Sequence, residues 1–131
     1  MDINREEGFK LGNINEGDGW KFFGRGLLQI TGRENYTNIQ ATIKRILPGV
    51  DLDLSLGVED FTAKEAILAG FGDWTDRGAH KLASKGFEDT HINAITKSIN
   101  KSTKSYLERR NAFQITRKVF GINRCHFINE E

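Results

Sequence analysis

The chain has a single cysteine, no long hydrophobic run and no excess charge of one sign. The lone Cys125 excludes an internal disulfide, a cysteine-based zinc site and a cysteine-ligated iron–sulfur cluster. No stretch approaches the roughly 18 consecutive apolar residues of a membrane span, and the first residues are mostly polar. We therefore expect a soluble protein that is cytoplasmic as synthesised, without a secretion signal or membrane insertion.

The charges nearly cancel, with 19 Lys and Arg against 18 Asp and Glu. A net charge of +1 gives no field that would attract nucleic acid or an anionic membrane. The basic residues between 97 and 110 do not change this, because Glu108 lies among them. We therefore expect no nucleic-acid partner.

With 131 residues, of which 37% are hydrophobic, the chain can build one small core, which predicts a single domain over residues 1–131.

Apolar residues that recur at three- and four-residue steps predict a mainly α fold. One such run begins at Asn35 and is stopped by Pro48-Gly49. Thr62 followed three residues later by Glu65 has the spacing of a capping box, which predicts the start of another helix. The helices expected from these patterns cover residues 35–47, 62–74, 76–85, 90–100 and 106–120.

Glycine is concentrated before residue 33, where it interrupts any periodic pattern and predicts loops and tight turns. Almost all strand signal falls in this region, so we expect a short irregular or β-hairpin segment near residues 20–31. Aromatic, glycine and hydrogen-bonding residues are packed into residues 17–36, as in loops that line a polar-ligand site. The alternative is a structural hairpin in which Arg25 holds backbone carbonyl groups.

Residues Gly24–Tyr36, GRGLLQITGRENY, resemble the signature of glycoside hydrolase family 19, the chitinases and related phage or bacterial endolysins. The resemblance continues upstream through Leu11-Gly12-Asn13 and Gly17-Asp18-Gly19-Trp20, and weaker blocks follow downstream. It implies a lysozyme-like helical domain that hydrolyses the β-1,4-linked N-acetylhexosamine polymers chitin or peptidoglycan, with inversion of configuration. It implies no cofactor and no metal, and an endolysin would act on the cell wall or in the periplasm.

The resemblance also implies roles for individual residues. Thr31 stands where the family holds the attacking water, and Gln29 and Asn35 stand at substrate-binding positions. Asn100 and Arg110 match later substrate-binding positions, although Asn100 is followed here by Lys-Ser instead of Gly-Gly. For Thr31 and Asn35 the alternative is capping of a helix N-terminus. For Asn100 it is a helix end, and for Arg110 a charged helix face.

Two aromatic residues beside this motif, Trp20 and Phe22, are candidates for stacking against sugar rings, together with Phe23. Core packing is the alternative for these aromatic side chains.

Inverting hydrolysis needs one carboxyl group as general acid and another as general base. In the resembling family the acid belongs to a His-Glu motif upstream of the Gly-Arg-Gly block, and this sequence contains no His-Glu dipeptide. The resemblance therefore implies the C-terminal part of the domain, N-terminally truncated, with impaired catalysis. The candidate substitutes are Glu6, Glu7 and Glu16, none in the apolar helix setting that suits an acid. Asp18 is expected to be a turn residue whose carboxylate accepts from backbone N–H groups.

A second interpretation is a non-catalytic glycan-binding or regulatory module that pairs with a lysin. The expected partners are chitin or peptidoglycan strands, and a separate N-terminal lobe or a second copy of the chain in a homodimer. Without an acid-bearing lobe, we expect uncovered apolar surface around Phe9, Leu11, Phe22, Phe23 and the helix at residues 62–74.

Overall fold

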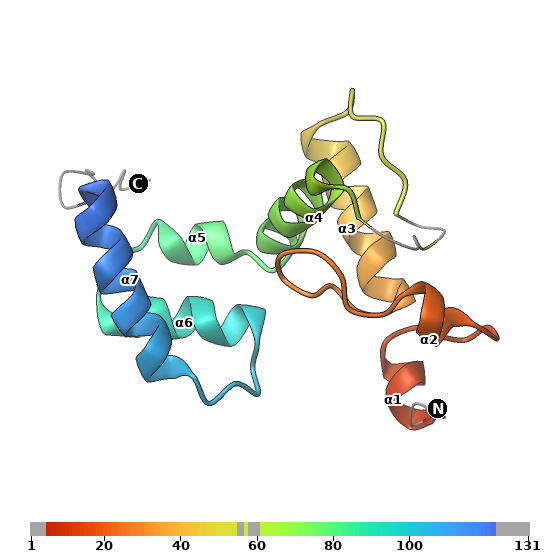
Figure 1. Cartoon of the computed structure of the whole chain (residues 1–131), viewed down its shortest axis with the longest axis horizontal. Coiled ribbons are helices and arrows are strands. Elements are labelled where there is room, and N and C mark those ends of the chain that lie inside the picture. Colours follow the sequence, from red (N-terminus) through yellow and green to blue (C-terminus); the bar gives the residue numbers. More distant parts are fainter. Residues whose placement is uncertain (1–4, 55–56, 58–60, 123–131) are drawn as a thin grey trace. The chain divides into compact units, whose positions relative to one another are not determined.

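The computed structural model describes residues 5–54, 57 and 61–122, with the backbone alone for residues 5–7. The chain divides into two compact units, Met1–Asp76 and Arg77–Glu131, and the expectation of a single domain over residues 1–131 stays a prediction. The protein is mainly helical, as the sequence predicts (Figure 1). No helix within the described ranges is long and apolar enough to cross a membrane.

The first unit is built around the helices α3 (Arg33–Ile46) and α4 (Ala63–Asp76), which lie side by side (Figure 1). Helix α3 buries Tyr36, Ile39 and Ile43. Helix α4 approaches closely because Gly72 faces α3: a Cβ at this position would lie 2.7 Å from Ile39 Cγ2. The remaining buried hydrophobic residues of this core are Phe22, Ile30, Leu52, Leu54 and Ala69.

The predicted capping box opens helix α4. The Thr62 backbone N–H donates to Glu65 Oε2 at 2.7 Å, and the Glu65 backbone N–H donates to Thr62 Oγ1 at 3.2 Å. Hydrogen bonds to the Glu65 carboxylate from the side chain and the backbone of Thr62 lower the pKa of Glu65. The sequence pattern therefore located the start of this helix correctly.

The expectation of loops alone before residue 33 is wrong in part. Two short helices, α1 (Arg5–Lys10) and α2 (Asp18–Lys21), interrupt this region. Each is six residues or fewer, too short to show an apolar repeat in the sequence. The expected hairpin is confirmed in its smallest form, since an antiparallel bridge joins Arg25 and Ile30.

The second unit contains α5 (Ala79–Ala83), α6 (Asp89–Ile99) and α7 (Tyr106–Phe120). Helix α6 packs against both of the others (Figure 1). These helices confirm the predicted ones, with α5 shorter than the expected span of residues 76–85. Helix α7 ends at Gly121, whose φ of +63° lies in the left-handed region.

Candidate functional site

A tight turn between Arg25 and Ile30 forms the centre of the candidate site. The two residues exchange backbone hydrogen bonds of 2.9 and 3.2 Å. Between them Gln29 has a φ of +55°, a left-handed conformation that is uncommon for a residue other than glycine. Its side-chain Nε2 donates to the Gly26 carbonyl at 3.1 Å, which stabilises the turn.

The side chains of Gln29, Thr31 and Asn35 come together beside this turn. Thr31 Oγ1 donates to the Gln29 carbonyl at 2.9 Å, and Asn35 Nδ2 donates to the Thr31 carbonyl at 2.6 Å. A Cβ at Gly24 would lie 3.1 Å from both Gln29 Oε1 and Thr31 Oγ1. Glycine at this position therefore lets two polar side chains lie directly against the backbone.

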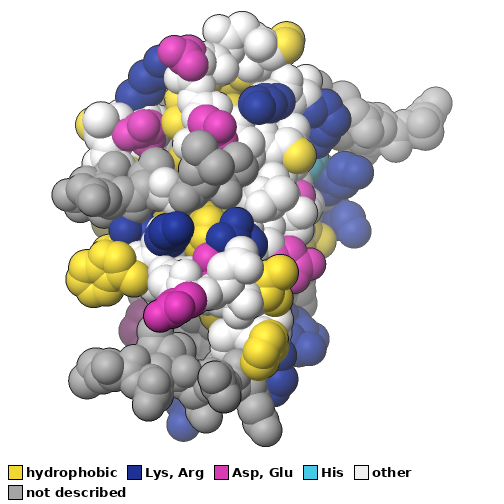
Figure 2. Space-filling view, turned by 90° about the vertical axis from the view of Figure 1, so that its right-hand side faces the viewer, with side chains coloured by type: hydrophobic (Ala, Val, Ile, Leu, Met, Phe, Trp, Pro, Cys, Tyr) yellow, Lys and Arg dark blue, Asp and Glu magenta, His cyan; other side chains and the backbone are white. Residues whose placement is uncertain are grey.

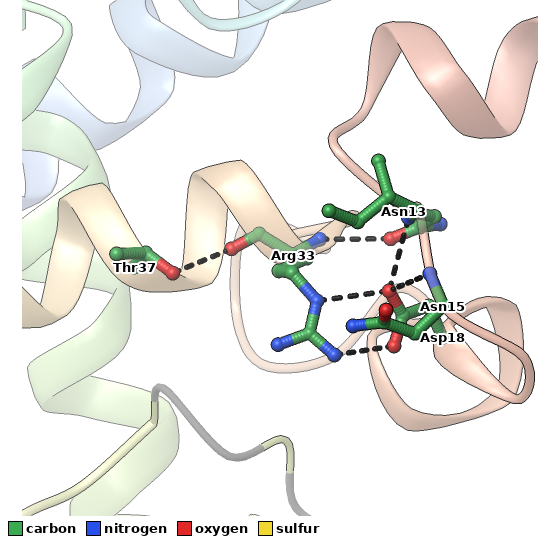
Figure 3. A network of polar contacts seen from close by, with 6 residues as sticks. Asn13, Asn15, Asp18, Arg33 and Thr37 are labelled. Carbon is green, nitrogen blue, oxygen red and sulfur yellow. Dashed lines mark hydrogen bonds and ion pairs between the residues drawn. The ribbon is translucent and has the colours of Figure 1, made fainter.

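The alternative that Thr31 and Asn35 cap helix α3 is wrong. The residue before the helix is Gly32, and no side chain there makes a capping bond. Instead, the Arg33 backbone N–H donates to Asn13 Oδ1 at 2.9 Å, and the Glu34 backbone N–H donates to the Leu11 carbonyl at 3.1 Å. Residues about 20 positions upstream thus satisfy the first turn of α3 (Figure 3).

The same upstream loop is fastened by a partly buried ion pair between Asp18 and Arg33 (Figure 3). Asp18 is 1% exposed and accepts hydrogen bonds from both Nε and Nη2 of Arg33, the first at 2.8 Å. Its Oδ2 also accepts from the backbone N–H groups of Ile14 and Asn15, which confirms the expected turn-capping role. The Arg33 hydrogen bond is the main reason why the pKa of Asp18 falls from 3.8 to about 2, while Asp18 raises the pKa of Arg33.

Arg25 takes the structural role that the hairpin interpretation predicts. Its buried guanidinium donates to the Lys21 carbonyl at 2.8 Å and to the Tyr36 hydroxyl at 3.3 Å, and lies 3.7 Å from the centre of the Phe23 ring. The Tyr36 hydroxyl in turn donates to the Phe23 carbonyl at 3.0 Å. These contacts connect the turn, the preceding loop and α3 into one support for the polar side chains.

The aromatic candidates separate into a core residue and exposed residues. Phe22 is 0% exposed and packs edge-on against Tyr36, with ring centres 5.3 Å apart. The expectation that Phe22 contacts substrate is therefore corrected, because its ring presents no face to a ligand. Trp20 is 78% exposed, and its ring lies 5.7 Å from that of the partly exposed Phe23.

The other two candidates belong to the second unit. Asn100 follows the last residue of α6, and its Oδ1 accepts from the Ser102 backbone N–H at 3.2 Å. Arg110 lies on α7, where its Nη1 donates to Asn93 at 3.0 Å and its Nε lies 3.3 Å from the Asp89 carboxylate. Both side chains thus make local contacts of the kind that the structural alternatives predict.

Among the described residues, the candidate carboxylates do not form a pair that could act as general acid and general base. Glu16 is exposed in the loop before α2, and the side chains of Glu6 and Glu7 lie outside the described residues. Asp18 lies near the candidate site, but its lowered pKa is the opposite of what a general acid needs. This carboxylate holds the loop in place.

Apolar surface is exposed at several of the expected positions. Phe9 is 61% exposed, Phe23 is 40% exposed, and Ile67 and Phe71 on α4 are exposed by 47% and 63%. Leu11 is half-buried, and Phe22 lies in the core. On the face drawn in Figure 2, hydrophobic side chains stand in separate spots between charged ones.

Two residues that support the site were not found from the sequence as contributors. Asn13 caps α3 through a hydrogen bond to Arg33, 20 positions along the chain. Arg33 also pairs with Asp18, 15 positions away. Both belong to the stretches that carry the family resemblance, so the resemblance was the signal that could have drawn attention to them.

The chain is similar to a protein of Haemophilus influenzae described as a "Glycosyl hydrolase family 19 domain-containing protein". The two are 46% identical over an alignment of 59 residues, and the match covers 40% of this chain and 30% of that relative. No family model and no solved structure matches the chain. The chain thus spans less than a third of the length of that relative.

Proposed function

We propose that the chain binds β-1,4-linked N-acetylhexosamine strands, of chitin or peptidoglycan, as a glycoside hydrolase family 19-like protein with weak hydrolysis of its own. The observation that carries this proposal is the position of the Gln29 and Thr31 side chains against Gly24, with the Asn35 side chain bonded to the Thr31 carbonyl. The similarity to a family 19 protein supports the same class of ligand.

The polar atoms of this cluster suit a glycan carrying hydroxyl and acetamido groups. Thr31 donates its only hydroxyl hydrogen to a backbone carbonyl, so the lone pairs of its oxygen can accept from a bound water. Asn35 uses its amide nitrogen within the protein, and Gln29 does the same, which orients their side-chain oxygens as acceptors. The exposed Trp20 adds an apolar face against which a sugar ring can lie.

Inverting hydrolysis requires a carboxylic acid and a carboxylate about 6.5 to 9.5 Å apart on opposite sides of the bond. Asp18 cannot serve as the acid because it is buried, ion-paired and ionised. In our proposal, Thr31 positions water and the neighbouring amides hold the glycan, while no described side chain protonates the leaving oxygen. Loss of a general acid reduces the rate by about 100- to 10,000-fold.

Binding is tested by calorimetric titration of the chain with N-acetylglucosamine oligomers. Asn35→Ala should weaken binding about fivefold, the effect of one lost neutral hydrogen bond, and Thr31→Val should do the same. The matched controls are Asn38→Ala and Thr37→Val, which alter the same residue types on exposed positions of α3. Equal affinity of all four variants would contradict the proposed site.

Hydrolysis is tested in parallel by the release of reducing ends from chitin oligomers and cell walls. We expect turnover close to background, unaltered by Glu16→Gln. Turnover comparable with that of an intact lysin and abolished by Glu6→Gln, Glu7→Gln or Glu16→Gln would show that this chain supplies its own acid.

A further inference from the structure

Helix α7 turns two arginines and two aromatic residues toward its own unit. The half-buried residues of this helix recur at steps of three and four, so they lie on one face; they are Tyr106, Arg110, Phe113 and Arg117. This face meets α6 and the segment before it through arginines: Arg110 contacts Asn93 and Asp89, and the Arg117 guanidinium lies 3.8 Å from the centre of the Phe87 ring. No residue of α7 is fully buried.

The opposite side of α7 is exposed and carries three large apolar residues and one asparagine in a row. Leu107, Asn111, Ile115 and Val119 follow one another at four-residue steps and form a continuous row, which we call the α7 row. Leu107 is 58% exposed, Ile115 65% and Val119 73%. Large apolar residues that line up and stay exposed on one helix face mark a surface that meets another molecule.

We propose that the α7 row is the interface of a homodimer, in which α7 packs antiparallel against α7 of a second copy. The charges that flank the row favour a second, antiparallel copy of α7 as the partner. Glu108 lies beside it in the first turn and Lys118 in the last turn. An antiparallel pair brings the glutamate end of each helix to the lysine end of its partner, whereas a parallel pair brings like charges together.

The row also has the geometry for self-association. Residues at four-residue spacing form the ridge that packs between the ridges of a second helix, the commonest mode of helix packing. A two-fold axis near the middle of α7 lets one row serve both copies. Because Glu108 and Lys118 balance each other, this face lacks the excess of cations typical of helices that lie on anionic membranes.

The proposal is tested by sedimentation velocity of the full chain, from about 1 to about 300 µM. One pair of helices buries less than the about 1,600 Å² of a standard interface, so we expect reversible dimerisation with a micromolar dissociation constant. Ile115→Gln should raise that constant at least about tenfold. Ile14→Gln is the matched control, because Ile14 in the other unit is 68% exposed, and it should leave dimerisation unchanged.

Charge reversal tests the antiparallel orientation independently. Glu108→Lys and Lys118→Glu should each weaken the dimer about three- to tenfold, and the double variant should restore it. A chain that stays monomeric throughout would overturn the proposal, and a lower melting temperature of Ile115→Gln in that monomer would show that another part of the chain covers the row. The proposal would also be overturned if Ile115→Gln left the dissociation constant of the dimer unchanged, or if the double reversal did not restore it.

Discussion

Each of the two units is stabilised internally by a different kind of contact. In Met1–Asp76, hydrophobic side chains from α3, α4 and the connecting loops form one buried cluster. In Arg77–Glu131, the buried residues within the described part are Ala79, Ile92 and Thr96, and Arg110 of α7 contacts α6. The unit with the apolar core also carries the candidate glycan site, whereas the unit with a thin core leaves an apolar row exposed. The candidate site, which needs fixed side-chain positions, thus lies in the unit with the larger buried core.

The largest expected effect is a cavity in the first core. Ile39→Ala should lower the free energy of unfolding by about 3 kcal/mol, because Ile39 is 1% exposed and packs against Gly72 and its neighbours. The same change at Ile92 should cost about half as much, since fewer buried groups surround it and they can relax.

Urea denaturation distinguishes the two changes. Both tryptophans, Trp20 and Trp74, lie in Met1–Asp76, so their fluorescence follows that unit, while far-ultraviolet circular dichroism follows all helices. Equal losses for the two variants would contradict the difference in core quality between the units.

The next effect is electrostatic and depends on pH. The pKa of Asp18 is about 2 in the folded chain, below its ordinary value of 3.8, so folding is favoured by about 2 kcal/mol when the carboxyl is ionised in both states. This contribution is complete above about pH 4 and disappears as the pH falls toward 2. Asp18→Asn should therefore lower the stability of the first unit at pH 7, by about 2 kcal/mol, and flatten its acid transition. An unchanged acid transition would contradict the proposed ionised state of Asp18.

The smallest effect is expected at the corresponding ion pair of the second unit. Asp89 is 66% exposed in its contact with Arg110, so water screens the attraction. Asp89→Asn should change the unfolding free energy by less than about 0.5 kcal/mol, with little dependence on salt. A loss as large as that of Asp18→Asn would show that the Asp89–Arg110 pair stabilises its unit as strongly as the Asp18–Arg33 pair stabilises the first.

The sequence predicted what is decided locally. Helix periodicity located α3, α4, α6 and α7, and the Thr62–Glu65 spacing located a helix start, because these signals lie within a few residues. The sequence could not show that Trp20 is exposed and Phe22 buried, because neither lies in a repeat that identifies a buried face. It also could not assign the cap of α3 to Asn13, because that hydrogen bond joins residues 20 positions apart.

The cap supplied by Leu11 and Asn13 also constrains the order in which the first unit folds. Amide groups in the first turn of a helix ordinarily lack partners and exchange rapidly with deuterium, but those of Arg33 and Glu34 are bonded to the upstream loop. These bonds form only after the intervening chain has closed into a loop, and closure carries an entropic cost. The turn with Gln29 and Thr31 lies inside that loop, so the cap and the candidate site depend on the same loop closure.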